Sequence, residues 1–218
     1  MPVKRPKHLL IVGGGVFQVP AIKIAQSMGL KVVVTDYNPE AEGMLLADYP
    51  IEVSTRNINL TVNTAKQFHR TCPLDGVLTV GTDASQTVAA VADALNLPGI
   101  PFEVAERATD KIKMRQVLQA KGVPVPAFRP IWTLEDCRQA IDDMPLPLVI
   151  KPCDNMGARG VRKIESIDDL VPAFREAKEA SISGKLILEE FMEGVELSLD
   201  ALVYENEIHI TGVADRII

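Results

Sequence analysis

Lys151 stands where an apolar run gives way to a glycine-containing loop, in the segment VIKPCDNMGARGVRKI (149–164). An unpaired ammonium is costly to bury, so we expect a lysine at the end of a buried strand to point into a cleft and meet an anion. Gly157 and Gly160 would let backbone N–H groups of the loop approach phosphate oxygens. The spacing does not fit a Walker phosphate-binding loop. Taken alone, the segment is at least as well explained as a turn between two strands.

Two other segments contain residues suited to a nucleotide. Lys111, in ATDKIKMRQVL (108–118), would be an ordinary solvated helix lysine unless it shares a polyphosphate with Lys151. In that case each close charge pair is worth ~4 kcal/mol gross at an effective dielectric constant of about 20. In LILEEFMEGVELSLD (186–200), backbone groups can read the edge of adenine between apolar side chains, and Glu196 can accept hydrogen bonds from ribose hydroxyls. By itself, this segment is more simply an acidic connection between strands.

A further segment, GGGVFQ (13–18), joins the first apolar run to a helix. Its glycines would let backbone N–H groups approach an anion, and the helix dipole would favour negative charge there. Asp36 ends the second apolar run ~20 residues later, where a dinucleotide-binding fold binds ribose, but Gln18 replaces the third glycine of that pattern. Binding of NAD, a substrate-facing turn and a purely structural turn all remain open. In the substrate-facing interpretation, the contacts come from this loop and the loop at 81–87, through Gly14, Gly15, Gln18, Thr82 and Asp83.

Composition limits the kind of protein that these segments belong to. The chain has 218 residues, of which 47% are hydrophobic and 24% charged, so it can bury a sizeable core in one large or two small domains. Its formal net charge of −6 argues against a nucleic-acid binder. No run approaches the ~20 apolar residues of a membrane helix. Three widely spaced cysteines indicate a reducing cytoplasm, and three histidines show no metal-ligand spacing.

Alternating strands and helices are predicted in the first part of the chain. Apolar runs at 8–13, 31–36, 51–54 and 76–81 predict four strands. The first helix is expected to bury a stripe made of Ala21, Ile24, Ala25 and Met28. Strands that alternate with helices in this way predict a doubly wound α/β sheet.

The pattern changes after Pro101. We expect Thr109 to cap a helix at 110–121, followed by a helix at 134–143 and another that begins with a capping box of Ser166 and Asp169. Strands are predicted at 186–191 and in the last segment, which would form a hairpin around 205–207. A strand-rich end after an α/β start predicts two modules, with a boundary near 102–108.

Three motifs in this order resemble the ATP-grasp superfamily: T-D-K-x-x-M-R (109–115), V-I-K-P-x-x-x-x-G-x-x-G-V (149–161) and L-E-E-F-M-x-G-x-E-L-S (188–198). The likeness is to ligases similar to the carbamoyl-phosphate synthase large chain, biotin carboxylase and the purine-pathway carboxylate–amine ligases. It covers nearly the whole chain. It implies a Rossmann-like pre-ATP-grasp domain with a doubly wound parallel sheet at 1–105, an α+β first ATP-grasp lobe at 106–190, and the start of the second lobe at 191–218.

The resemblance also implies roles for particular residues. Lys111 and Lys151 would hold the α- and β-phosphates of ATP, and the loop of Gly157 and Gly160 would fold over the β- and γ-phosphates. Adenine would be contacted by Glu189 and by the backbone of Glu190 and Met192, and ribose by Glu196. ATP would phosphorylate a small-molecule carboxylate, and an amine or another nucleophile would then displace phosphate from the acyl phosphate. Relatives are often dimers, so a homodimer is one option, and the sequence leaves the oligomeric state open.

The metal site implied by the resemblance is not found in this sequence. In such ligases Mg²⁺ is held by a Glu followed by Glu-x-Asn in the second lobe, and we expect these ligands downstream of residue 218. The chain alone is therefore expected to be inactive, and no catalytic residue is assigned. Two other functions are weighed: an NAD(P)-linked oxidoreductase that uses residues 13–18 and Asp36, and a non-catalytic nucleotide-binding protein.

Overall fold

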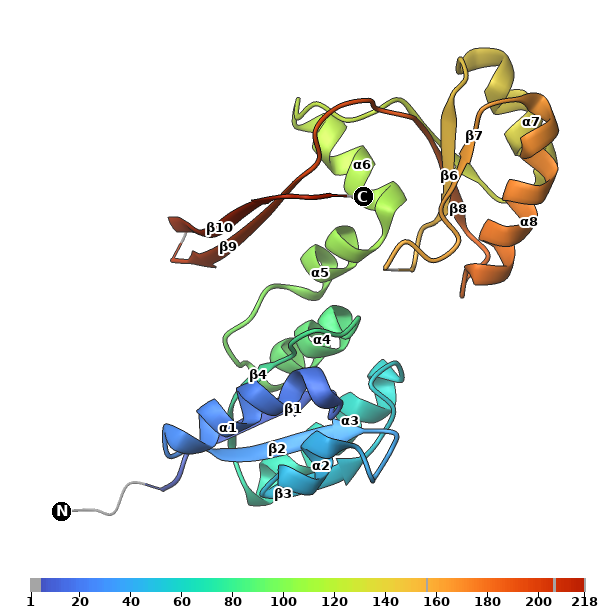
Figure 1. Ribbon diagram of the computed structural model, residues 1–218. Coiled ribbons are helices and arrows are strands. Elements are labelled where there is room, and N and C mark those ends of the chain that lie inside the picture. The colour runs from blue at the N-terminus through green and yellow to red at the C-terminus, as the bar shows by residue number, and fades with distance from the viewer. Residues whose placement is uncertain (1–4, 156, 206, 218) are drawn as a thin grey trace. The chain divides into compact units, whose positions relative to one another are not determined.

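The computed structural model describes residues 5–155, 157–205 and 207–217. They form two compact units (Figure 1). The first unit contains the described residues up to Val125, together with Cys153–Arg159 and Ser181–Ser183. The second contains Pro126–Pro152, Gly160–Ala180 and the described residues from Gly184 onward. The chain therefore passes between the units more than once.

The sheet of the first unit is parallel, as the alternation of strands and helices predicts. Its strands are β1 (His8–Val12), β2 (Lys31–Asp36), β3 (Tyr49–Glu52) and β4 (Leu74–Leu78), in the order β3-β2-β1-β4. Strands β3 and β4 begin two residues before the predicted runs at 51–54 and 76–81. The extra residues of β4 include Asp75. A charged residue is not expected in a buried strand, so the apolar pattern did not include it. In the structure its carboxylate accepts hydrogen bonds from Arg5 and His8.

Helices cover both faces of this sheet. Leu10 and Val12 of β1 face a core shared with α3 (Ile58–Thr71) and α4 (Ser85–Leu95). Ile11, between them, points to the opposite core, shared with α1 (Val19–Ser27) and α2 (Glu42–Leu46). Successive side chains of a strand point to opposite faces, so a strand that is apolar throughout fits a sheet buried on both sides. The doubly wound prediction is confirmed.

The buried stripe of α1 differs from the prediction. Ile22 and Ala25 are buried, whereas Ile24 and Met28 are 59% and 71% exposed. The buried residue one turn before Ile22 is Gln18, which donates a hydrogen bond to the carbonyl oxygen of Val80. Gln18, Ile22 and Ala25 are spaced i, i+4 and i+7, so the true stripe begins with a polar residue that a hydrophobic pattern omits.

A short helix that was not predicted precedes α6. It is α5 (Phe102–Thr109), and it is followed by α6 (Lys111–Ala120). Thr109 does not cap α6, because it ends α5 and its hydroxyl donates to the carbonyl oxygen of Ala105. Asp110 is the cap instead: its Oδ1 accepts hydrogen bonds from the backbone N–H groups of Ile112 and Lys113, at 2.9 and 3.1 Å.

The second unit has an antiparallel sheet with helices on one face. Its strands, β5 (Phe128–Ile131), β6 (Leu148–Pro152), β7 (Arg162–Ile164) and β8 (Leu186–Glu190), lie in the order β5-β8-β6-β7. Figure 1 shows α7 (Leu134–Asp143) and α8 (Leu170–Ala180) on the same side of this sheet. Leu148, Ile150 and Leu188 share one core with these helices. The predicted bounds of α7 and the capping box of Ser166 and Asp169 are confirmed.

The last described segment forms the predicted hairpin. Strand β9 (Leu197–Tyr204) pairs antiparallel with β10 (Glu207–Asp215), and Asn206 of the predicted turn lies outside the described residues. At the open end of the hairpin, the N–H of Arg216 donates to the carbonyl oxygen of Glu196 at 2.9 Å. Within the part of the chain that the structure describes, these two strands pair only with each other.

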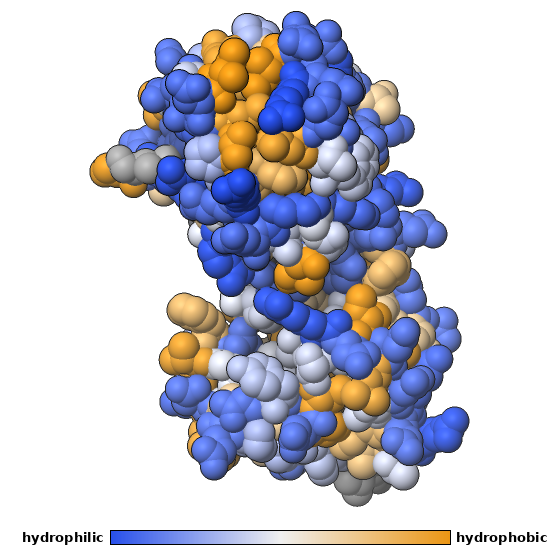
Figure 2. Space-filling model, turned by 90° about the vertical axis from the view of Figure 1, so that its right-hand side faces the viewer, coloured by the Kyte–Doolittle hydropathy of each residue, from blue (hydrophilic) through white to orange (hydrophobic). Residues whose placement is uncertain are grey.

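The protein surface is mixed in character. Figure 2 shows one face, on which apolar residues gather in patches among more numerous hydrophilic ones. The exposed apolar side chains of the first unit include Phe17 and Tyr37, which are 71% and 73% exposed. Among the described residues, no helix combines the length and the hydrophobicity that crossing a membrane requires.

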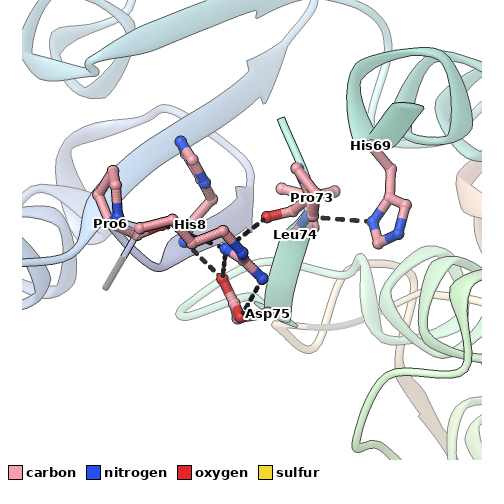
Figure 3. A network of polar contacts seen from close by, with 7 residues as sticks. Pro6, His8, His69, Pro73, Leu74 and Asp75 are labelled. Carbon is pink, nitrogen blue, oxygen red and sulfur yellow. Dashed lines mark hydrogen bonds and ion pairs between the residues drawn. The ribbon is translucent and has the colours of Figure 1, made fainter. Parts of the chain in front are cut away.

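Asp75 ties the start of β1 to the start of β4. Its two carboxylate oxygens each accept a hydrogen bond from the Arg5 guanidinium at 2.8 Å, and Oδ2 also accepts from the His8 N–H at 2.9 Å (Figure 3). Nearby, the N–H of Leu74 donates to Nδ1 of His69 at 3.0 Å. The hydrogen bonds from Arg5 hold the pKa of the Asp75 carboxyl below its usual value.

We predict that Asp75→Asn lowers the free energy of unfolding by about 1 kcal/mol at pH 7, because the amide cannot form the bidentate ion pair. A carboxyl whose pKa is lowered by folding stabilises the protein above its unfolded pKa and loses that effect as the pH falls through the folded value. The difference between variant and parent should therefore shrink below about pH 4. Urea unfolding at several pH values measures it, with the exposed Glu52→Gln of β3 as control. A difference independent of pH would contradict the assignment.

Candidate functional site

A cavity of about 520 Å³ lies at the carboxyl ends of the parallel strands of the first unit. Its lining comes from the segments that follow the four strands and includes Gly15, Asp36, Arg56 and Thr82. The carboxyl edge of a parallel sheet is where such folds bind ligands. Of the predicted substrate-binding residues, Gly15, Gln18 and Thr82 line this cavity, Asp83 lines a neighbouring one of about 200 Å³, and Gly14 lines neither.

The glycine loop binds the rest of its own unit through its backbone. The N–H of Gly13 donates to the Thr35 carbonyl oxygen, and the N–H of Gly14 donates to Oδ2 of Asp36, both at 2.8 Å. These two amides are therefore already occupied by acceptors of their own unit. A Cβ on Gly14 would lie 2.9 Å from Cγ of Met44, so glycine is required there by packing.

Asp36 and Gln18 also make internal contacts. Buried Asp36 accepts hydrogen bonds from the backbone N–H groups of Gly14 and Asn38, at 2.8 and 2.9 Å, and so joins the loops after β1 and β2. Gln18 joins the start of α1 to the loop after β4 through its bond to Val80. Both side chains thus shape the cavity wall.

Arg56 lines both of these cavities and was not among the predicted site residues. It follows β3 after a short turn of Val53, Ser54 and Thr55, which places it at the same sheet edge as the glycine loop. The signal available in the sequence was positional: a charged residue just beyond the end of a predicted parallel strand. A composition-based search passes over it because exposed arginines are common.

In the second unit, strand register brings Lys151 and Glu189 together. Lys151 is opposite Ile187 in the β6–β8 ladder, and Glu189 is opposite Val149. Both side chains therefore leave the sheet on the face opposite α7 and α8, as diagonal neighbours. Nζ of Lys151 lies 2.5 Å from Oε2 of Glu189, and the two side chains are only 18% and 4% exposed. The lysine thus meets a carboxylate of its own unit.

A second lysine, Lys163, lies on the same sheet face. It is directly opposite Val149 in the β6–β7 ladder, which puts it in one row with Glu189. Its Nζ is 4.2 Å from the ring centroid of Phe191 and 2.6 Å from Oε1 of Glu165. We call Lys151, Lys163, Glu189 and Phe191 the charged face of the second unit. Lys163 was not predicted, because the pairing of β6 with β7 cannot be known from the sequence alone.

The remaining residues predicted to contact adenine and ribose are all exposed. The N–H of Glu190 donates to the Ala127 carbonyl oxygen at 2.9 Å, which leaves that amide occupied. Met192 is exposed and lies in the connection between β8 and β9. Oε2 of Glu196 lies 3.5 Å from the Arg216 guanidinium across the base of the β9–β10 hairpin. Contacts of these residues with a nucleotide stay predictions.

The predicted phosphate loop contacts Lys111 within the first unit. Nζ of Lys111 donates to the Asn155 carbonyl oxygen at 2.6 Å, and its backbone N–H donates to the Cys153 carbonyl oxygen at 3.3 Å. Asp154 accepts hydrogen bonds from the backbone N–H groups of Ile182 and Ser183, at 3.3 and 2.5 Å. Lys111 belongs to the first unit and Lys151 to the second, so their meeting over one triphosphate stays a prediction.

The two loop glycines are constrained in different ways. Gly157 and Gly160 both have positive φ, at +70° and +71°. A Cβ on Gly160 would lie 2.5 Å from Cβ of Ala180, whereas a Cβ on Gly157 would meet nothing within 4 Å. Gly160 is required by packing as well as by backbone conformation, and Gly157 by backbone conformation alone.

Among the described residues, no cluster of metal-ligating side chains is found, and two of the three cysteines are buried. The described residues contain no group of three or more His, Cys, Asp or Glu side chains that could hold a metal ion. Burial raises the pKa of Cys137 and of Cys153 to about 12. Such thiols stay protonated and unreactive at neutral pH.

Comparison with known families supports the resemblance seen in the motifs. Residues 108–218 match the model of the ATP-grasp domain, and residues 22–99 match that of the ATP-grasp N-terminal domain. The chain is 20% identical over 227 residues to the carbamoyl phosphate synthase arginine-specific large chain of Eremothecium gossypii, covering 96% of this chain and 20% of that protein.

Solved structures show the same architecture. An L-amino acid ligase from Bacillus licheniformis has a TM-score of 0.78 and 25% identity, covering 98% of this chain and 51% of that one. An N5-carboxyaminoimidazole synthetase from Staphylococcus aureus, solved with ADP, has a TM-score of 0.80 and 20% identity, covering 99% and 56%. The chain thus spans about half the length of these structures, and less of the curated relatives it matches.

The fold and the matched domains define an α/β protein with a pre-ATP-grasp sheet followed by an ATP-grasp lobe. The chain belongs to the ATP-grasp superfamily.

We predict that Lys151→Met lowers the free energy of unfolding by about 3 kcal/mol, because it leaves the buried Glu189 carboxylate without its lysine partner. Adding Glu189→Leu should restore most of the loss, since the buried carboxylate is then removed as well. A double-mutant cycle by urea unfolding measures the coupling, with Lys163→Met as control at no more than about 0.5 kcal/mol. Additive losses would contradict the ion pair.

We also predict that Gly160→Ala destabilises the protein more than Gly157→Ala. The second substitution costs about 1 kcal/mol from its positive φ alone. The first adds a clash with Ala180 worth about 1–3 kcal/mol more. Both free energies come from urea unfolding curves, and equal losses would contradict the packing of Gly160 against α8.

Proposed function

We propose that this protein is part of an ATP-dependent ligase that activates a carboxylate as an acyl phosphate and joins it to an amine or a related nucleophile. The observation that supports this proposal best is the charged face of the second unit, within the region that matches the ATP-grasp domain. The comparisons add relatives whose names describe ligases and synthetases, one of them solved with ADP.

In this proposal the charged face binds ATP as a substrate. Lys151 is held in one position by Glu189, so little side-chain entropy is lost when phosphate oxygens approach its remaining hydrogens. Lys163 adds a second positive charge on the same face, and Phe191 offers a ring beside it. Lys111 would supply a further ammonium, exchanging the Asn155 carbonyl oxygen for a phosphate oxygen. Glu189, Glu190 and Met192 would contact adenine, and Glu196 ribose.

The proposed chemistry proceeds in two displacements. An oxygen of the carboxylate attacks the γ-phosphorus of ATP, the bond to the bridging oxygen breaks, and ADP leaves. The amine nitrogen then attacks the acyl carbon, phosphate leaves with the bonding electrons, and the nitrogen gives up a proton. An acyl phosphate reacts readily with water, so the loop of Gly157 and Gly160 would act by covering it.

Two other functions can be compared with the ligase on the contacts of the same residues. An NAD(P)-linked oxidoreductase would use Asp36 to bind ribose, but that carboxylate already accepts two backbone hydrogen bonds inside its unit. A non-catalytic nucleotide-binding protein would use the same charged face and would differ only in forming no product. We rank both below the ligase. The proposal further places the protein in the cytoplasm, which the three free cysteines favour, as a homodimer with small-molecule partners.

We predict that Lys151→Ala weakens binding of ADP with Mg²⁺ at least tenfold in isothermal titration calorimetry, because a positioned cation is lost from the phosphate site. Lys66→Ala on the exposed side of α3 removes the same charge elsewhere and should leave the Kd unchanged. Nucleotide binding that does not depend on Lys151 would overturn the assignment of the charged face. Tight NAD binding abolished by Asp36→Ala would favour the oxidoreductase.

Acyl-phosphate formation needs a separate measurement. Hydroxylamine traps an acyl phosphate as a hydroxamate, so a panel of carboxylic acids with ATP and Mg²⁺ should give hydroxamate together with ADP. We expect this from a version of the protein extended beyond residue 218 and not from the 218-residue chain. Strong turnover by the short chain would refute the placement of the metal ligands downstream. Nucleotide binding by the extended protein without any acid-dependent product would favour the non-catalytic alternative.

A further inference from the structure

Arg56 is a charged residue in the lining of the 520 Å³ cavity of the first unit. Each carboxylate that lines the two cavities is already engaged: Asp36 accepts from Gly14 and Asn38, and Asp154 accepts from the 181–183 segment. Asp83 lies 3.7 Å from the Arg159 guanidinium. Among the described residues, by contrast, no hydrogen bond or ion pair is made by the guanidinium of Arg56. A cation in a cavity whose acids are occupied favours an incoming anion.

Two buried hydroxyl groups donate hydrogen bonds to the backbone of the turn that holds Arg56. The Thr61 hydroxyl donates to the Ser54 carbonyl oxygen at 3.1 Å, and the Thr87 hydroxyl donates to the Thr55 carbonyl oxygen at 2.6 Å. Both threonines are almost fully buried, one in α3 and the other in α4. Their bonds hold the backbone just before Arg56 against two helices. The arginine is therefore presented from a rigid part of the unit, which is how a recognition residue is best positioned.

Two aromatic side chains give the same cavity an apolar part. Phe17 and Tyr37 both line it, although each is more than two-thirds exposed. Phe17 lies against the loop after β4, because a Cβ on Gly81 would come within 3.0 Å of Cβ of Phe17. Exposed aromatic rings beside a cavity are suited to cover the apolar body of a ligand.

We propose that this cavity binds a small organic acid, with Arg56 holding an anionic group and with Phe17 and Tyr37 covering the apolar body. The guanidinium presents a planar fork that matches a carboxylate in two parallel hydrogen bonds. The hydroxyls of Ser54, Thr55 and Thr82, on the same cavity wall, supply further polar contacts. This inference deepens the proposed function, since it names the class of acid that the ligase would take.

The test is an NMR titration of the ¹⁵N-labelled 218-residue chain at constant ionic strength. The probes are 3-phenylpropionate, acetate and inorganic phosphate. We expect saturable shifts at the turn of Arg56 and at the loop of Gly15 with 3-phenylpropionate, and at least fivefold weaker binding of the other two anions. Arg56→Gln should weaken binding of 3-phenylpropionate about tenfold, and Phe17→Ala several-fold. Arg70→Gln, which removes the same charge at the far end of α3, should have no effect.

Specific outcomes would overturn the inference. These are the absence of saturable shifts, equal binding by Arg56→Gln, or acetate or phosphate binding as tightly as 3-phenylpropionate. Arg56→Lys serves as a second variant in case Arg56→Gln misfolds: it keeps the charge without the planar fork, and binding unchanged from the parent would refute bidentate recognition. A parallel ADP titration of the protein extended beyond residue 218, with Mg²⁺ present, separates the two proposals. Arg56-dependent binding of the acid without ADP binding would leave this site standing and the ligase assignment refuted, whereas the reverse result would refute only the organic-acid site.

Discussion

A lysine ammonium that is mostly removed from water needs a counter-charge, and the pairing of β6 with β8 supplies one. Because Lys151 and Glu189 are diagonal neighbours on the same sheet face, their side chains meet without any distortion of the strands. A slip of one residue in that register would turn one of the pair toward the apolar core beneath α7 and α8, where it would be unpaired. The ion pair therefore favours the observed register of β6 with β8, and that register in turn brings the two side chains together. The positions of the other residues on the charged face follow from the same strand pairing.

In the first unit, residues whose types suit ligand binding already use their polar groups in hydrogen bonds within the fold. Gly13, Gly14 and Asp36 have the types and spacing of a nucleotide-binding loop, yet their polar groups are consumed in joining β1 to β2. Arg56 lines the same cavity but belongs to no recognisable motif. A count of hydrogen-bond partners thus separates the residues that build the cavity from those that face into it. The same count, applied to Lys151, shows a side chain that is held in position by one acid while its ammonium retains further donors.

Sequence reasoning reached the fold and the motifs because both rest on local signals. Apolar runs bounded by glycine mark β1 and β2, and the capping box at Ser166 marks the start of the helical turn before α8. It failed where a polar residue takes the place of an apolar one, as with Gln18 in the stripe of α1. It also failed where two adjacent residues compete for one role, as when Asp110 rather than Thr109 caps α6. Lys163 and Arg56 needed strand pairing and sheet-edge geometry, which depend on contacts between residues distant in the chain and are not written in any single segment.

The loop between β6 and β7 combines these constraints in one segment. Its far end is fixed, because Gly160 has no room for a side chain beside α8. Its near end is held by Asp154 and by the bond from Lys111 to the Asn155 carbonyl oxygen. Between them, Ala158 has a φ of +57°, which costs a non-glycine residue about 1 kcal/mol or more, and a Cβ on Gly157 would meet nothing within 4 Å. A ligand that competes for Lys111 would remove its hydrogen bond to the Asn155 carbonyl oxygen, which is one of the contacts at the near end of the loop. The backbone at Ala158, which has the unfavourable positive φ, would then be held less firmly.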